Sequence, residues 1–252
     1  MIKFFRKIRQ NLLTENKLSK YFLYAVGEIV LVVLGILIAL QLNNYNDTLK
    51  QEKQELKTLV NLNLDFEFNL SEIERNINIL KNNTNASIKV ISHTGNKFSD
   101  DFDINSLLDQ TVYIPQYFPQ NGFLLELMNS GNLGIIRNDI LRNRLSSWLP
   151  TLETLNDKEQ FALEFCKDLI RYIVKNGSWI KADEMSTDEQ IQGIGIPKSG
   201  FEIDNNRMLN SVEFENLIEN QIVNNTILLE RQERCLKLNK EIVELLRSEI
   251  KK

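Results

Sequence analysis

The strongest hydrophobic pattern in the chain is an unbroken apolar stretch close to its N-terminus. Residues 21–42 read YFLYAVGEIVLVVLGILIALQL and include a single charged residue, Glu28. A helix of this length crosses a hydrocarbon core of ~30 Å and satisfies its own backbone hydrogen bonds in lipid. A cleavable signal peptide is the alternative, but it has a shorter apolar core and a small-residue cleavage site, which Ala39-Leu40-Gln41 does not provide. We therefore expect residues 21–42 to form an uncleaved transmembrane helix.

Beyond this stretch, apolar residues recur at helical spacing, with no Pro or Gly before Gly95. In a heptad that takes Leu49 as an a position, eight of the ten a and d residues are apolar. More apolar residues lie outside this seam, which favours a bundle helix over a two-stranded coiled coil. Asn63 falls at an a position, where a buried asparagine would fix register; the alternative is an Asn63 that faces solvent. The a residues are Leu49, Leu56, Asn63, Leu70 and Ile77, and the d residues are Glu52, Leu59, Phe66, Ile73 and Leu80.

The rest of the chain alternates between helical patterns and two loop-rich connections. Asn-rich residues 82–85 suggest a weak point in the first helix, residues 92–119 a long connection, and residues 178–210 a second connection with room for a short strand. The predicted helices are residues 123–131 with Gly131 as C-cap, 139–149 with Asn138 as N-cap and Pro150 as stop, 151–176, and 211–252. We expect an all-α fold: a transmembrane helix continuing into an antiparallel helical bundle, in which the C-terminal helix packs on the first.

Charge predicts the orientation of this anchor. The first twenty residues hold six cations and one acid, whereas the remainder carries 24 cations and 33 acids. By the positive-inside rule, we expect residues 1–20 in the cytoplasm and residues 43–252 outside, as a helical domain that in a Gram-negative cell would be periplasmic. Residues 1–20 also resemble an amphipathic interfacial segment attracted to anionic lipid, although they can equally be charges that only set the topology. The acidic body argues against nucleic-acid binding.

Glu28 is the intramembrane candidate for function, because an ionisable side chain in an apolar span is costly. It lies roughly 10 Å beyond Tyr21 along the helix axis. One hypothesis is a protonatable group at an interface with other membrane subunits. The arrangement of tail, acidic span and outer domain is similar to the smaller subunit of proton-driven stator complexes. The alternative is that Glu28 reaches water at the cytoplasmic face, pairs with Lys20, or sits neutral in a helix contact.

Small residues on the same predicted span would permit close helix contact. Gly27 and Gly35 lie eight residues apart, and Gly35 with Ala39 forms a small-xxx-small step. We therefore expect the lipid bilayer as one partner, and a second copy or another inner-membrane protein as the other.

Side chains that could carry catalysis or bind metal are few. His93 is the only histidine, so no multi-histidine zinc site can form. Residues 101–106 begin like a calcium loop, but Ser106 replaces the required glycine and Val112 the bidentate glutamate, which favours a helix cap. Cys166 and Cys235 lie on two predicted amphipathic helices, either as a disulfide or as two buried free thiols. We expect no metal and no cofactor.

Two segments resemble a family of uncharacterised, N-terminally anchored membrane proteins common in Bacteroidota. They are the opening MIKFFRKIRQNLLTENKLSKYFLYAVGEIVLVVLGILIALQLNNYN and the later LLELMNSGNLGIIRNDILRNRLSSWL. The resemblance implies a bacterial inner-membrane setting. It implies no activity, cofactor or site residue.

The sequence thus predicts a non-enzymatic membrane-anchored protein that presents a periplasmic helical domain for interaction or assembly, as an oligomer. The alternative is an accessory subunit of a proton-coupled inner-membrane complex that uses Glu28. A third hypothesis, a periplasmic ligand-sensing domain, would need a partner, because about twenty cytoplasmic residues are too few for an output domain.

Overall fold

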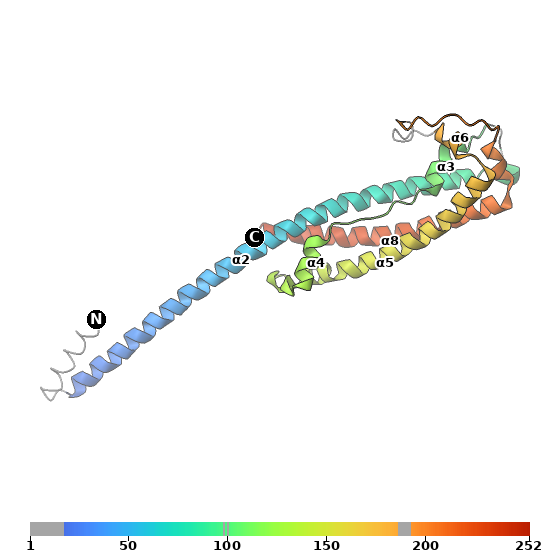
Figure 1. Cartoon of the computed structure of the whole chain (residues 1–252). Helices are drawn as coiled ribbons and strands as arrows, with labels where there is room; N and C mark the ends of the chain where they lie inside the picture. Colours follow the sequence, from blue (N-terminus) through green and yellow to red (C-terminus); the bar gives the residue numbers. More distant parts are fainter. Residues whose placement is uncertain (1–17, 98, 100, 186–192) are drawn as a thin grey trace. The chain divides into compact units, whose positions relative to one another are not determined.

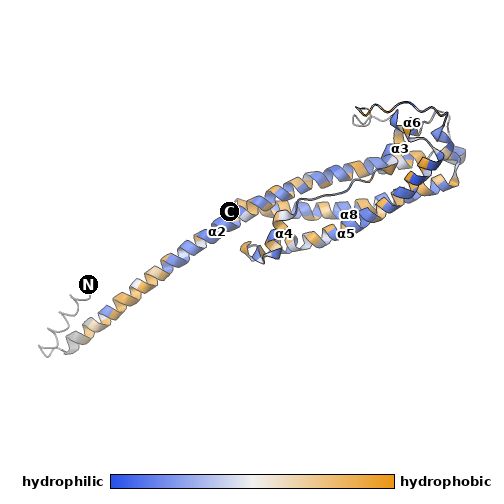
Figure 2. Ribbon diagram, viewed as in Figure 1, coloured by the Kyte–Doolittle hydropathy of each residue, from blue (hydrophilic) through white to orange (hydrophobic). Residues whose placement is uncertain are grey.

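The computed structural model describes residues 18–97, 99, 101–185 and 193–252, so the predicted interfacial segment lies almost wholly outside the described residues. The chain divides into two compact units, Met1–Leu56 and Lys57–Lys252. In the first unit, the described chain is the beginning of helix α2 (Leu18–Ile91). Figure 2 shows the apolar turns of this part of α2. Among the described residues, one helix is long and apolar enough to cross a membrane, and its apolar window is not buried.

The second unit is built on three long helices: the later part of α2, α5 (Asp139–Asn176) and α8 (Val212–Ile250) (Figure 1). Helix α8 runs antiparallel to α2, because ion pairs join the two in reversed order along the chain. The bridges are Arg247–Glu67 at 3.1 Å, Lys240–Glu74 at 2.8 Å and Lys81–Glu233 at 3.0 Å. The predicted packing of the C-terminal helix on the first is therefore confirmed.

An extended segment, residues 113–121, lies along the bundle without helical or strand structure of its own. We call it the strap. It joins α3 (Asn105–Val112) to α4 (Gly122–Asn129), and Figure 1 shows it as a thin ribbon. Because its hydrogen bonds to α2 and α5 follow each helix in reverse order, the strap runs opposite to both. The bundle therefore has three long helices, with an extended chain where a fourth would lie.

Two apolar cores hold this unit together. The larger joins α2, α5, α8, α4 and the strap, and its two largest fully buried side chains, Phe66 and Trp148, have ring centroids 5.0 Å apart. The smaller core lies where α2 ends and α8 begins, and gathers Phe214, Leu108 and Met208. It also takes in α6 (Trp179–Asp183) and the short 3-10 helix η3 (Asn205–Asn210). Two more 3-10 turns, η1 (Gly95–Lys97) and η2 (Asn132–Ile135), complete the described elements.

Helix α5 corrects the predicted stop at Pro150. One helix runs from Asp139 to Asn176 with Pro150 inside it, where two helices were expected. Proline removes the hydrogen bond to the carbonyl four residues earlier, that of Ser146. Both residues lie on the exposed face, where water can bind that carbonyl. The predicted N-cap is confirmed, because Asn138 accepts from the Leu141 N–H at 3.0 Å. Gly131 has the expected left-handed φ of 70°, but α4 ends at Asn129 and its C-cap is Ser130.

The loop-rich connections are also more helical than expected. Helix α3 lies inside the predicted 92–119 connection, and the described part of 178–210 contains α6 and η3 but no strand. The Asn-rich run 82–85 does not interrupt α2.

The predicted heptad of α2 is half right. From Leu59 to Leu80 its d residues are buried, but Leu49 and Leu56 are exposed. The second row of the core is shifted one residue earlier than the predicted a positions. Its members are Leu62, Asn69, Asn76, Asn83 and Val90. Three asparagines in this row hide it from a search for apolar periodicity.

Candidate functional site: a buried polar seam

Three buried asparagines on α2, seven residues apart, hold the strap. The Nδ2 of Asn69 donates to the Gln120 carbonyl at 2.9 Å, that of Asn76 to the Gln116 carbonyl at 2.9 Å, and that of Asn83 to the Tyr113 carbonyl at 2.8 Å. The Gln120 N–H in turn donates to Asn69 Oδ1 at 2.6 Å. We call this row the asparagine ladder.

The spacing of the ladder fits both partners. Seven helical residues rise roughly 10.5 Å, and three to four extended residues span roughly 10–13 Å. An extended chain needs partners for its backbone groups, and here side-chain amides take the place of a neighbouring strand.

Helix α5 supplies further partners to the strap and its ends. Glu159 Oε1 accepts the Tyr117 N–H at 3.1 Å, and Trp148 Nε1 donates to Asn121 Oδ1 at 2.7 Å. Cys166 Sγ donates to the Val112 carbonyl at 2.8 Å. The Tyr117 hydroxyl donates to the backbone carbonyl of Asn69 at 2.9 Å, so the strap also bonds directly to the α2 backbone.

Helix α8 carries a second buried polar row, Asn225, Gln232 and Asn239, again seven residues apart. We call the asparagine ladder, this row and the buried Glu159 of α5 together the polar seam. The Asn239 amide donates to the Phe66 carbonyl at 3.0 Å and accepts from the Leu70 N–H at 3.0 Å. It thus binds the two backbone groups that an α-helix normally pairs with each other. A buried amide that binds these backbone groups favours one register of α8 against α2 and opposes a shift of one helix along the other.

Glu159 is the acid at the centre of this seam, with 3% of its surface exposed. Burial raises its pKa to about 7, and the Tyr117 N–H and the Gln232 amide oppose that rise. Glu159 also lies at a pocket of about 300 Å³, whose walls include Tyr117, Pro119, Leu149 and Leu152. The arrangement can therefore take up and release a proton near neutral pH inside the bundle.

The two cysteines are buried free thiols, so the disulfide alternative is not formed. Burial raises the pKa of Cys166 to about 11 and that of Cys235 to about 12. Both therefore remain protonated at neutral pH, a state that neither attacks substrates nor binds metal well.

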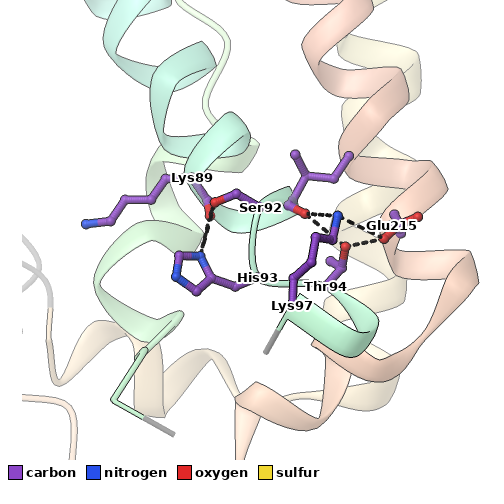
Figure 3. Close-up of polar contacts among 7 residues, drawn as sticks. Lys89, Ser92, His93, Thr94, Lys97 and Glu215 are labelled. Atoms are coloured by element: carbon purple, nitrogen blue, oxygen red, sulfur yellow. Dashed lines mark hydrogen bonds and ion pairs between the residues drawn. The ribbon is translucent and has the colours of Figure 1, made fainter. Parts of the chain in front are cut away.

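A second polar cluster closes the end of α2 and fastens it to α8 (Figure 3). The Ile91 carbonyl accepts from Thr94 Oγ1 at 2.9 Å and from Lys97 Nζ at 3.0 Å. Thr94 Oγ1 also contacts Glu215 in the first turn of α8, and Lys97 Nζ lies 4.0 Å from the same carboxylate. A cation and a hydroxyl at the last carbonyls of a helix stabilise its C-terminus.

His93 belongs to the same cap. Its Nδ1 lies 2.8 Å from the Lys89 carbonyl, and its ring stacks on Phe102 with centroids 3.8 Å apart. At residues 101–106, where the sequence begins like a calcium loop, Asp103 Oδ1 accepts the Asn105 N–H at 2.9 Å and the Asn105 Nδ2 at 2.7 Å. The N-cap residue of α3 is Ile104, which makes no side-chain cap bond. Among the described residues, no group of three or more His, Cys, Asp or Glu side chains is placed to hold a metal ion.

The remaining candidates from the sequence lie on α2. Glu28 is half-buried in a hollow lined by Ala25, Ile29, Val32 and Val33. Gly27, Gly35 and Ala39 are exposed.

Asn63 lies at the edge of the bundle core rather than in either of its rows. Its Nδ2 donates to Glu67 Oε1 at 2.7 Å, and Glu67 in turn bonds to Arg247 of α8. Its proposed role in fixing register stays a prediction.

Comparison with known proteins relates part of the chain to a family. Residues 28–148 match a family of unknown function (DUF6090). The match covers the asparagine ladder, the strap and the beginning of α5, and it ends before Glu159 and α8. Searches of curated proteins and of solved structures found no match.

Sequence reasoning missed the ladder, Tyr117 and Glu159. The signal that could have found the ladder is the seven-residue spacing of Asn69, Asn76 and Asn83 on a helix whose other inward positions are apolar. Glu159 carries no such signal, because its burial depends on the strap.

Proposed function

We propose that this chain is a non-enzymatic, membrane-anchored protein that presents its helical domain for interaction or assembly on the periplasmic side of the bacterial inner membrane. One observation carries the proposal: α2 is a single helix that begins as an exposed apolar stretch and ends inside a packed helical unit. An apolar helix with no cover of its own in water is suited to lipid. The six cations ahead of it support the cytoplasmic placement of the N-terminus.

The polar seam supports a presenting role over a catalytic one. The three amides of the asparagine ladder and the Glu159 carboxylate bind the strap backbone, and the Asn239 amide binds the α2 backbone, which favours one arrangement of the bundle. Such a core gives a defined outer surface on which a partner can dock.

The topology can be tested with fusions in a Gram-negative host. A phosphatase that is active only in the periplasm, fused after Lys252, should be active, whereas a fluorescent protein that folds only in the cytoplasm should be dark there. The matched control lacks residues 21–42 and should reverse both readouts. Alkaline carbonate should leave the full chain in the membrane pellet. An inactive phosphatase fusion, or release of the chain from the membrane by carbonate, contradicts the proposal.

A second candidate function is suggested by the half-buried position of Glu28 in an apolar hollow. In that case the chain is an accessory subunit of a proton-coupled membrane complex. Co-purification from native nanodiscs distinguishes the two candidate functions, because a proton-coupled subunit requires multi-span partner proteins in a fixed ratio.

A further inference from the structure

The part of α2 that precedes the bundle carries a row of residues on one side of the helix. Steps of three and four residues connect its members, the spacing of a left-handed coiled coil. We call it the anchor seam. Its members are Val32, Gly35, Ala39, Leu42, Asn46, Leu49, Lys53 and Leu56.

The leucines of the anchor seam are exposed. Leu42, Leu49 and Leu56 keep 60%, 45% and 47% of their surface accessible. They lie seven residues apart along the helix. Large apolar side chains repeated every seven residues along one side of a helix favour burial against another helix.

Gly35 in the anchor seam also favours contact with another helix. A Cβ built on Gly35 would meet no described atom within 4 Å, so packing in the described chain does not require a glycine there. Glycine lowers helix stability relative to alanine, and in a membrane it allows a second helix to approach closely.

We propose that the anchor seam binds the anchor seam of a second copy of this chain, in parallel and in register. This inference rests on the proposed membrane anchoring, since two copies inserted in one membrane have the same orientation. In a parallel pair each leucine meets its own counterpart, so a single repeating row is complementary to itself.

The polar members fit this pairing. In the heptad frame of the anchor seam, which differs from the frame used above for the bundle, Leu42, Leu49 and Leu56 are d residues. The a positions in water are then Asn46 and Lys53, and an Asn or Lys at such positions selects register and a low oligomer number. Glu52 then lies at the neighbouring g position, where its carboxylate meets the Lys53 ammonium of the other copy.

Disulfide cross-linking in native membranes tests the pairing. In the full chain, Leu49→Cys should form a dimer with copper phenanthroline at least tenfold faster than Gln51→Cys, which lies on another side of the same turn. The unsubstituted chain is the baseline, because its two thiols are buried. Equal rates for both variants, no dimer with Leu49→Cys, or a product with a different protein would each overturn the proposal.

A second variant separates the seam from the anchor. In a Leu42→Cys chain, adding Leu49→Glu and Leu56→Glu should lower cross-linking at least tenfold while helix content stays unchanged, because both leucines are exposed in the single chain. Undiminished cross-linking overturns the seam. Release of the chain by carbonate rejects the anchor instead, and a dimer that persists in the released chain still supports the seam.

Discussion

At the scale of single residues, the least expected feature is a carboxylic acid in the bundle core. Glu159 bonds to the strap backbone, and its pKa is raised from an ordinary 4.5 to about 7 by burial. The folded chain therefore holds this proton more tightly than the unfolded chain. The contribution to stability is fully present below pH 4.5 and is lost as the pH rises through 7, by about 3 kcal/mol at most.

Replacing Glu159 by Gln should remove this dependence. The amide retains an oxygen for the Tyr117 N–H but has no charge to bury, so the variant should be more stable than the wild type at pH 8 and similar to it at pH 5. Urea unfolding of the detergent-solubilised full chain, followed by circular dichroism at a series of pH values, measures the difference.

The control is Glu153→Gln, an exposed carboxylate on the same helix, which should leave the pH profile as it is. If wild type and Glu159→Gln lose stability in parallel between pH 5 and 8, the proton is not held by Glu159.

At the scale of elements, the register of α2 against α8 is set by charges of mixed sign. Glu67, Glu74 and Lys81 on one helix meet Arg247, Lys240 and Glu233 on the other, each set in steps of seven. A slip by one heptad would bring like charges together, either Glu74 with Glu233 or Lys81 with Lys240. These pairs are about half exposed, so each adds little stability while still opposing the slip.

Charge reversal tests this role. Lys81→Glu and Glu233→Lys should each destabilise the chain by less than ~1 kcal/mol, and the double variant should recover most of the loss. The coupling energy comes from a double-mutant cycle of urea unfolding, and it should shrink in 1 M salt because the pair is screened.

Reversing Glu164 and Lys167, a pair within α5, serves as the comparison because it joins no two helices. A double variant of Lys81 and Glu233 no more stable than the worse single variant would mean that the pair does not act across the interface.

The elements also show what can be read from sequence. The caps of α5 and α8 were predictable, since Asn138 and Ser211 each accept an N–H of the first turn, a short-range interaction. The strap was not, because nothing in residues 113–121 marks Ile114 and Tyr117 as buried, and the α2 side chains that bind its backbone lie 30 to 51 residues away. The helix stop predicted at Pro150 was wrong for a related reason. A helix tolerates a proline on its solvent-exposed side, and the sequence alone does not show which side of α5 faces solvent.

At the scale of the whole molecule, Glu28 distinguishes the two proposed functions. Replacing Glu28 by Gln keeps the shape of the side chain and removes its charge. If the chain is an anchored interaction protein, the variant should insert in the membrane, co-purify with the same chains in the same ratio and leave growth unchanged. Native mass measurement in nanodiscs and growth of the host carrying the variant provide the readouts.

Loss of a co-purifying multi-span protein, or a growth defect at full membrane insertion, would favour the proton-coupled subunit instead. Leu31→Ala, an apolar change in the same part of α2, controls for a general weakening of the span.

The strap also constrains how the protein can change in length. From Asn69 to Asn83, α2 rises roughly 21 Å, and the seven steps between their partners Tyr113 and Gln120 cover roughly 23 Å. One inserted residue would move every later carbonyl by about 3.3 Å, more than two helical residues, and break the ladder beyond that point. Related chains should therefore keep a fixed number of residues in the strap, without insertions or deletions there.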